Sequence, residues 1–228
     1  MTFTTPTHDR DLALREDILR TAIRMNAAGI NQGKSGNVSA RTAVGFLITP
    51  TGIPYEDTRR EDIVPMALDG THTGPVRPSS EWRFHRDLYV ARPEVQAIVH
   101  THAVHCTALA VHGRGIPAFH YMVAIAGGAD IRCAPYATFG TQELSDHALA
   151  ALEDRKACLL AHHGMIAVGR DLDQALAIAV EVEVLARTYL AALAVAEPPL
   201  LPADEMARVI EKFATYGQQA EAEAGAEA

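Results

Sequence analysis

Apolar residues recur at helical spacing in six stretches of this chain. In residues 11–28, Leu14, Ile18 and Ala22 fall on one helical face, and Gly29 provides a C-terminal stop. A second helix is expected to begin at Ser79 or Ser80, either of which is a good N-cap, and to end near residue 91. The same spacing predicts helices over residues 103–111, 142–154, 171–194 and 203–216.

Shorter apolar runs predict strands over residues 45–49, 63–68, 95–99, 157–161 and 165–168. Residues 31–39 are polar and contain glycine, which indicates a loop. Residues 113–140 are rich in Gly and Pro, which indicates irregular or short-stranded structure. These elements predict an α/β fold: a single domain with a central mixed β-sheet flanked by helices on both faces.

Composition narrows the class of protein. The 228 residues are 48% hydrophobic and 21% charged, which suffices for one well-packed core. The formal net charge of −8 argues against nonspecific nucleic-acid binding, which needs a basic surface. No apolar run is long enough to span a membrane, and the polar start of the chain does not resemble a signal peptide. The 3 cysteines are widely spaced without a CxxC pair, so we expect no disulfide framework and a cytoplasmic protein.

A pair of histidines at the end of one predicted strand carries the clearest chemical signal. His100 and His102 follow the apolar run 95–99, and alternate residues of a strand point to the same face. Two imidazoles on one face make half of a metal site. With His163 and Glu81 they would supply three neutral nitrogens and a carboxylate, a set that suits zinc or a similar divalent ion. The alternative is two polar residues at a strand end.

The other two proposed ligands have structural alternatives as well. His162 and His163 are adjacent, so one would bind metal while the other packs or hydrogen-bonds, and Gly164 would let the backbone pass close to the site. The alternative is an ordinary turn after a buried strand. Glu81 stands near a helix start, where the helix dipole alone favours a carboxylate. Its functional interpretation is a metal ligand or a base beside the metal.

Three loops with small side chains and free amides suit a phosphate group. They are centred on Gly36 with Asn37, on Thr51 with Gly52, and on the serines 79 and 80. Each alone is an ordinary turn or helix cap. Elsewhere, we expect the histidines at 105, 112 and 120 to pack or lie at the surface, and Glu181 and Glu183 to be solvated.

Taken in order, these segments resemble the class II aldolases of the fuculose-phosphate aldolase type. The resemblance covers nearly the whole chain. The matching segments are NQG (31–33), GNVS (36–39), ITPTGIPYE (48–56), SSEWRFH (79–85), HTHAVHC (100–106), HYM (120–122), CAPYATFGT (133–141), HHG (162–164), EVEVLA (181–186) and KFATYG (212–217).

The resemblance implies a role for each matched position. Zn²⁺, or another divalent ion such as Mn²⁺ or Co²⁺, would be held one per chain by His100, His102, His163 and, in the resting enzyme, Glu81. Glu81 would leave the ion on substrate binding and move the proton at the carbon that becomes nucleophilic. The substrate phosphate would be held by Gly36, Asn37, Thr51, Gly52, Ser79 and Ser80. The remaining roles would fall to Tyr121, which exchanges the proton at the aldehyde oxygen from a neighbouring subunit, and to Phe139 and Tyr216, which shape the aldehyde end.

The resemblance also implies a largely antiparallel sheet, a domain spanning residues 1–217 and a fourfold-symmetric homotetramer with sites between subunits. Residues 218–228 are rich in Ala and Glu without an apolar face, so we expect a flexible tail there. The implied reaction is reversible cleavage of L-fuculose 1-phosphate, or a similar ketose 1-phosphate, to dihydroxyacetone phosphate and L-lactaldehyde or a similar aldehyde.

Alternatives remain open. One is an aldolase for 5-deoxy- or 5-methylthio-ribulose 1-phosphate, and another is an L-ribulose-5-phosphate 4-epimerase, although the epimerase pattern has Asp where this chain has Glu81. A noncatalytic metal-binding protein is a third. Lys34 departs from the family pattern, which has a small residue there.

Overall fold

The computed structural model describes residues 6–213 and contains six α-helices and two short 3₁₀ helices in that part of the chain. The α-helices are α1 (Pro6–Ala27), α2 (Trp82–Ala91), α3 (Val104–Val111), α4 (Gln142–Ala151), α5 (Leu172–Leu193) and α6 (Ala203–Phe213). The 3₁₀ helices are η1 (Arg60–Asp62) and η2 (Tyr121–Ala126).

Seven strands form one sheet in the order β3-β2-β1-β4-β7-β6-β5. They are β1 (Asn37–Arg41), β2 (Gly45–Ile48), β3 (Val64–Ala67), β4 (Ala97–Thr101), β5 (Cys133–Ala134), β6 (Ala157–Leu160) and β7 (Gly164–Gly169). Within the described residues β5 and β6 are the one parallel pair, and the other neighbours are antiparallel. The predicted mixed, largely antiparallel sheet is confirmed.

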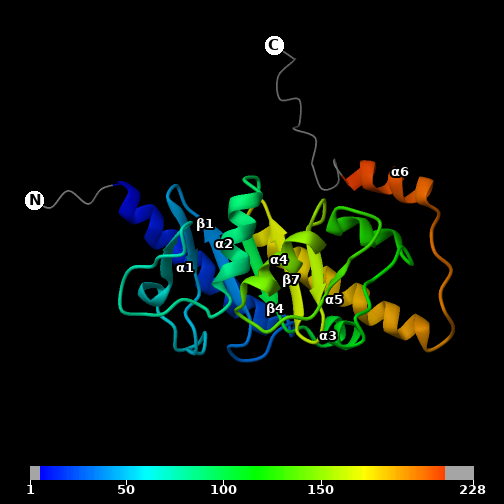
Figure 1. Cartoon of the computed structure of the whole chain (residues 1–228), viewed down its shortest axis with the longest axis horizontal. Helices are drawn as coiled ribbons and strands as arrows, with labels where there is room; N and C mark the ends of the chain where they lie inside the picture. The colour runs from blue at the N-terminus through cyan, green and yellow to red at the C-terminus, as the bar shows by residue number, and fades with distance from the viewer. Residues whose placement is uncertain (1–5, 214–228) are drawn as a thin grey trace, which may run out of the picture.

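The two faces of the sheet carry separate hydrophobic clusters. Alternation along β4 sends Ala97 and Val99 into the cluster with α1, α3 and α5, and sends Ile98 into the cluster with α2 and α4. Figure 1 shows α2 and α4 lying over the strands, with α6 at one end of the molecule beyond an extended connection from α5. The α/β fold with helices on both faces is therefore confirmed.

β1 was not predicted, because residues 31–39 were interpreted as a polar loop. The strand pairs with β2 on one side and β4 on the other, with Asn37 opposite His100 and Ser39 opposite Ile98. Both polar side chains are buried, at 2% and 0% exposure. They are tolerated there because α2 and its N-cap residue Glu81, 44 to 50 positions later, satisfy them with hydrogen bonds.

Helix α2 begins at Trp82, with Glu81 as its N-cap residue, so neither Ser79 nor Ser80 caps it. The backbone N–H of Trp82 donates instead to the Ser79 carbonyl at 3.2 Å, which makes residues 79–82 a turn. At the other end of the chain, the expected end of the last helix, Tyr216, the domain limit at 217 and the tail 218–228 lie outside the described residues. Between residues 6 and 213, no helix combines the length and apolarity needed to cross a bilayer.

Candidate metal centre and active site

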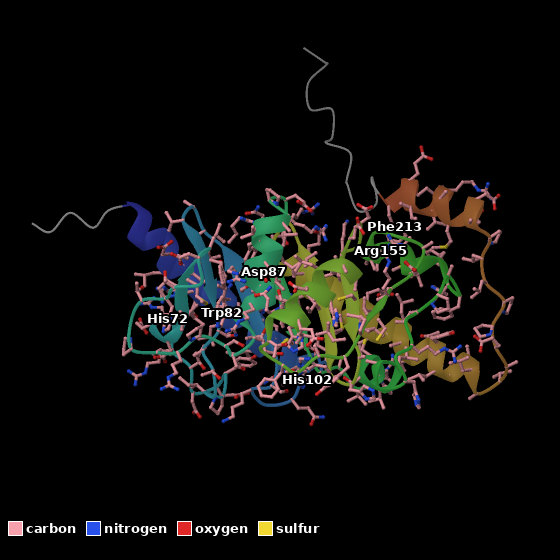
Figure 2. The ribbon with its side chains drawn as sticks, in the orientation of Figure 1. His72, Trp82, Asp87, His102, Arg155 and Phe213 are labelled. Atoms are coloured by element: carbon pink, nitrogen blue, oxygen red, sulfur yellow. The ribbon has the colours of Figure 1, made fainter. Side chains whose placement is uncertain are left out.

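His100 and His102 meet at the end of β4, as the strand alternation predicts. His100 is fully buried, on the same sheet face as Ile98. Its Nδ1 lies 2.9 Å from the carbonyl oxygen of Met165 on the neighbouring strand β7. That contact fixes Nδ1 as the protonated nitrogen and leaves the Nε2 lone pair free for a metal. The two Nε2 atoms of His100 and His102 are 3.1 Å apart. Figure 2 shows His102 at one end of the strands, where connecting segments gather.

The turn between β6 and β7 brings His163 to the same place. The backbone of His162 adopts a left-handed conformation with φ of 55°, and its ring contacts Tyr136 edge-on at 5.9 Å. His163 instead packs its ring against His100 and His102 at 4.8 and 4.9 Å. Gly164 is required next, since a Cβ there would lie 2.4 Å from the Thr101 carbonyl oxygen. The two adjacent side chains therefore point apart, with His163 in the cluster and His162 against Tyr136, and metal binding by His163 stays a prediction.

Glu81 completes the cluster with both carboxylate oxygens. Oε2 lies 3.1 Å from Nε2 of His100, and Oε1 lies 3.1 Å from Nε2 of His163. Oε1 is buried, yet no donor in the described part of the chain makes a hydrogen bond to it. The carboxylate therefore turns toward the histidines and caps no helix N–H, which argues against the purely structural interpretation.

The donor set fits a divalent metal ion. The four ligand atoms all lie within 4.8 Å of one another. Ligands about 2.0–2.1 Å from a tetrahedral zinc stand roughly 3.3 Å apart, close to the separations between these side chains. The unpartnered Oε1 of Glu81 is the kind of buried atom that an ion would satisfy.

The electrostatics of the cluster also suit a metal. Burial, reinforced by the neighbouring rings of His100 and His163, lowers the pKa of His102 to about 4, so its imidazole is neutral at physiological pH. Burial opposes the charged form of Glu81, but the facing His100 and His163 outweigh it and hold the pKa of its carboxyl well below the usual range. A neutral imidazole at His102 and an ionised carboxylate at Glu81 are the protonation states in which such groups bind metal.

The three loops predicted to bind phosphate lie together. The Thr51 N–H donates to the Arg77 carbonyl at 3.1 Å and the Ser79 N–H to the Thr49 carbonyl at 3.0 Å, so two of the loops run side by side. The third is joined to them because the Val38 N–H donates to Thr49 Oγ1 at 3.2 Å.

A cavity of about 590 Å³ opens over the cluster. Its walls include Lys34, Gly52, Ser80, Glu81, His102, Phe139 and His163. Asn37 lies behind the wall residue Glu81, and its amide Nδ2 donates to Glu81 Oε2 at 3.0 Å. Gly36 lies against the backbone of β4, where a Cβ would come within 2.5 Å of the His100 carbonyl oxygen. Thr51 and Ser79 are held in the paired loops behind the walls.

Tyr121 does not join the cavity of its own chain. It lines a second cavity of about 550 Å³ together with Phe119 and α6 residues such as Val209, and it is 51% exposed. Phe139 does line the metal-site cavity and is 65% exposed. Tyr216 lies outside the described residues.

His85 is a site residue to which the sequence interpretation gave no role. It is fully buried, and its Nε2 lies 2.5 Å from Oδ1 of Asn37. Burial lowers the pKa of His85 to about 3, so the ring is neutral. The sequence does carry a signal for His85. Glu81, His85 and Tyr89 are spaced four residues apart and so share one helical face.

Glu183 was expected to be solvated, and this prediction is wrong. Its carboxylate accepts hydrogen bonds from the backbone N–H groups of His105 and Cys106, both at 2.9 Å, and lies 2.7 Å from His105 Nδ1. It therefore serves α3 as an N-terminal cap supplied by α5, immediately after the His100–His102 segment.

Comparison with known proteins agrees with this architecture. Residues 16–190 match the model of the class II aldolase and adducin N-terminal domain. The chain belongs to the class II aldolase family. It is 58% identical over 210 residues to 5-methylthioribulose-1-phosphate/5-deoxyribulose-1-phosphate aldolase of Rhodospirillum rubrum, covering 92% of this chain and 95% of the relative. It is 54% identical over 209 residues to L-fuculose phosphate aldolase of Escherichia coli strain K12, covering 91% and 97%.

A solved L-fuculose 1-phosphate aldolase has the same fold, with a TM-score of 0.86 at 38% identity, covering 89% of this chain and 96% of that one. This class II aldolase is accordingly a carbon–carbon lyase of a metal-dependent family. The noncatalytic alternative loses its support, because the R. rubrum and E. coli relatives are named as aldolases.

Proposed function

We propose that this enzyme cleaves a ketose 1-phosphate by a zinc-dependent retro-aldol reaction, giving dihydroxyacetone phosphate and an aldehyde. The observation that carries the proposal is the shared cavity. Gly52 and Ser80 from two phosphate-type loops line the same space as Glu81, His102 and His163. A metal site and a phosphate site that line one cavity can hold the two ends of one small phosphorylated ketose.

His100, His102, His163 and Glu81 would hold Zn²⁺ in the resting enzyme. When bound, the ion supplies Lewis-acid stabilisation of the negative charge that develops on the ketone half during cleavage. The chain's own contribution is orientation, since the Met165 carbonyl fixes the His100 ring and Gly164 admits the backbone beneath it.

Glu81 is assigned the proton transfer at carbon. It is the carboxylate that lines the cavity, and it is held in the ionised form, which is the form that can accept a proton. The substrate phosphate is assigned to the loops bearing Gly36, Asn37, Thr51, Gly52, Ser79 and Ser80. The pairing of these loops uses the Thr51 and Ser79 N–H groups and brings Gly52 and Ser80 to the cavity wall.

Tyr121 is assigned the proton at the aldehyde oxygen, in a site completed by a neighbouring subunit. Its exposure and its separation from the cavity of its own chain both fit a residue that acts in a partner's site. We therefore propose a fourfold-symmetric tetramer, with Phe139 and Tyr216 at the aldehyde end. A cytoplasmic location is proposed as well, because Cys106, Cys133 and Cys158 are all free.

Two substrate assignments compete within this mechanism. We assign L-fuculose 1-phosphate as the substrate, in line with the 54% identity to the E. coli enzyme. The competing assignment is a 5-deoxy- or 5-methylthio-ribulose 1-phosphate, which the 58% identity to the R. rubrum enzyme supports. A panel of ketose 1-phosphates that differ only beyond the cleaved bond tests both. We expect one member to exceed the others in kcat/KM, with dihydroxyacetone phosphate as the common product. Absence of that product from every member would contradict the proposed reaction.

Lys34 is expected to strengthen substrate binding through the phosphate. It lines the cavity, and its Nζ donates to the Gly52 carbonyl at 2.8 Å, within the proposed phosphate loops. Lys34→Thr should raise the KM of the ketose phosphate roughly fivefold, as an exposed charge contact is worth about 1 kcal/mol, with kcat little changed. Steady-state kinetics measure this, and Lys156→Thr, a change outside this cavity, is the matched control. An unchanged KM would show that Lys34 does not contact the phosphate.

A further inference from the structure

A continuous chain of buried hydrogen bonds leads away from Glu81 into the space between α2 and β1. Asn37 Nδ2 donates to Glu81 Oε2 at 3.0 Å, and Asn37 Oδ1 lies 2.5 Å from His85 Nε2. His85 Nδ1 lies 2.7 Å from Ser39 Oγ, which lies 2.8 Å from the Tyr89 hydroxyl. All five residues are at most 5% exposed. Water therefore does not offer these groups alternative partners.

The donor and acceptor of every hydrogen bond in this series follow from the Glu81 end. An ionised carboxylate only accepts hydrogen bonds, so the Asn37 amide must turn its N–H₂ toward Glu81 and its oxygen toward His85. His85 must then carry its proton on Nε2, which leaves Nδ1 as an acceptor. Ser39 consequently donates to Nδ1.

The far end closes the chain. Because the single hydroxyl proton of Ser39 is used on His85, the Tyr89 hydroxyl must be the donor to Ser39 Oγ. One arrangement of protons satisfies all four contacts, so the chain holds each of its members in a single orientation.

We propose that His85 is a positioning residue, which fixes the Asn37 amide with an N–H facing Glu81, and that Ser39 and Tyr89 lock His85 in the required tautomer. A reversed Asn37 amide would set its oxygen against the Glu81 carboxylate. The proposal deepens the proposed function, on which it rests for the role of Glu81 as ligand and base. Because the His85 contact prevents the amide from rotating, the Asn37 N–H stays directed into the site when the carboxylate moves.

The His85 tautomer can be measured in the native enzyme. Solid-state ¹⁵N NMR of histidine-labelled, zinc-loaded enzyme should show His85 protonated at Nε2 alone, with a His85→Gln sample assigning the signal among the 11 histidines. Protonation at Nδ1 would reverse the donors and acceptors in this series of hydrogen bonds and overturn the proposal. Neither result depends on whether any ketose phosphate is cleaved, so failure of the proposed function is distinguishable from failure of this inference.

The lock is tested by Ser39→Ala, which removes the donor to Nδ1. We expect a second His85 tautomer and a zinc dissociation constant raised about tenfold, the lower limit for loss of an outer-shell partner. Ser145→Ala is the matched control, because Ser145 is also fully buried and bonds to Asp87, outside the chain of bonds. It should change neither readout.

His85→Gln separates positioning from simple packing. A glutamine can donate to Asn37 from the same place without a tautomer to lock, so zinc affinity should stay within about threefold of the native value, and adding Ser39→Ala should have no further effect. If Ser39→Ala weakens zinc equally in both backgrounds, or in neither, the lock does not exist.

Discussion

Removal of the divalent ion should abolish cleavage, and its return should restore it. Metal analysis of the native protein should find about one ion per chain, as expected for one four-ligand site. The loss should be large, because Lewis-acid stabilisation is worth several kcal/mol and each 1.36 kcal/mol is about tenfold in rate. Dialysis against a chelator, followed by kinetics with added Zn²⁺, Mn²⁺ or Co²⁺, measures both the effect and the preferred metal. Full activity in metal-free protein would contradict the mechanism.

Two adjacent histidines provide the matched variants for this experiment. His163→Asn removes a ring that lies 3.1 Å from Glu81 Oε1. It should weaken metal binding by more than the ten- to hundredfold typical of outer-shell changes. His162→Asn alters a ring that contacts Tyr136, and asparagine tolerates its positive φ. This variant should still bind one ion per chain. Similar losses in both would mean that the histidines are not divided as the geometry indicates.

The histidine cluster was predictable because the relevant geometry is local. Alternation along one strand places His100 and His102 together, and adjacency in a turn separates His162 from His163. The mixed sheet and the helices on both of its faces also followed from the strands and helices that the apolar pattern predicts. Glu81 was grouped with these histidines only as a fitting type of ligand, since spacing alone equally allowed a carboxylate at a helix start, and its specific roles came from the family resemblance.

The failures of prediction share a physical cause. β1 was interpreted as a loop because Asn37 and Ser39 are polar. The side chains that satisfy them lie 44 to 50 residues away, on α2 and its N-cap residue Glu81. Glu183 was expected in solvent because its partners lie 77 and 78 residues earlier. A polar residue is read as exposed until its distant partner is known. Tyr121 is a different case, since its assigned site lies beyond its own chain.

Glu81→Gln should leave the fold intact and nearly abolish proton exchange at the reacting carbon of dihydroxyacetone phosphate. Glutamine has nearly the same shape and retains an oxygen that can accept from Asn37, but it cannot take up the proton. General-base catalysis contributes roughly 10²–10⁴-fold, so a loss in that range is expected with zinc at saturation. Exchange of the C–H proton with deuterated solvent, followed by NMR, measures this step without any aldehyde. Unchanged exchange would remove Glu81 as the base.

Tyr121→Phe is the comparison that separates the two proton transfers. The variant keeps the aromatic ring and loses only the hydroxyl, which is assigned to the aldehyde oxygen and to no step at the exchanging carbon. Exchange on dihydroxyacetone phosphate should therefore proceed at nearly the native rate, while cleavage of the ketose phosphate slows by a factor within the same 10²–10⁴ range. Since Tyr121 lies outside the metal-site cavity of its own chain, this selective loss also requires a neighbouring subunit at the site. Equal loss of exchange and cleavage would place Tyr121 in a structural role, and the need for a subunit contact at the aldehyde end would disappear with it.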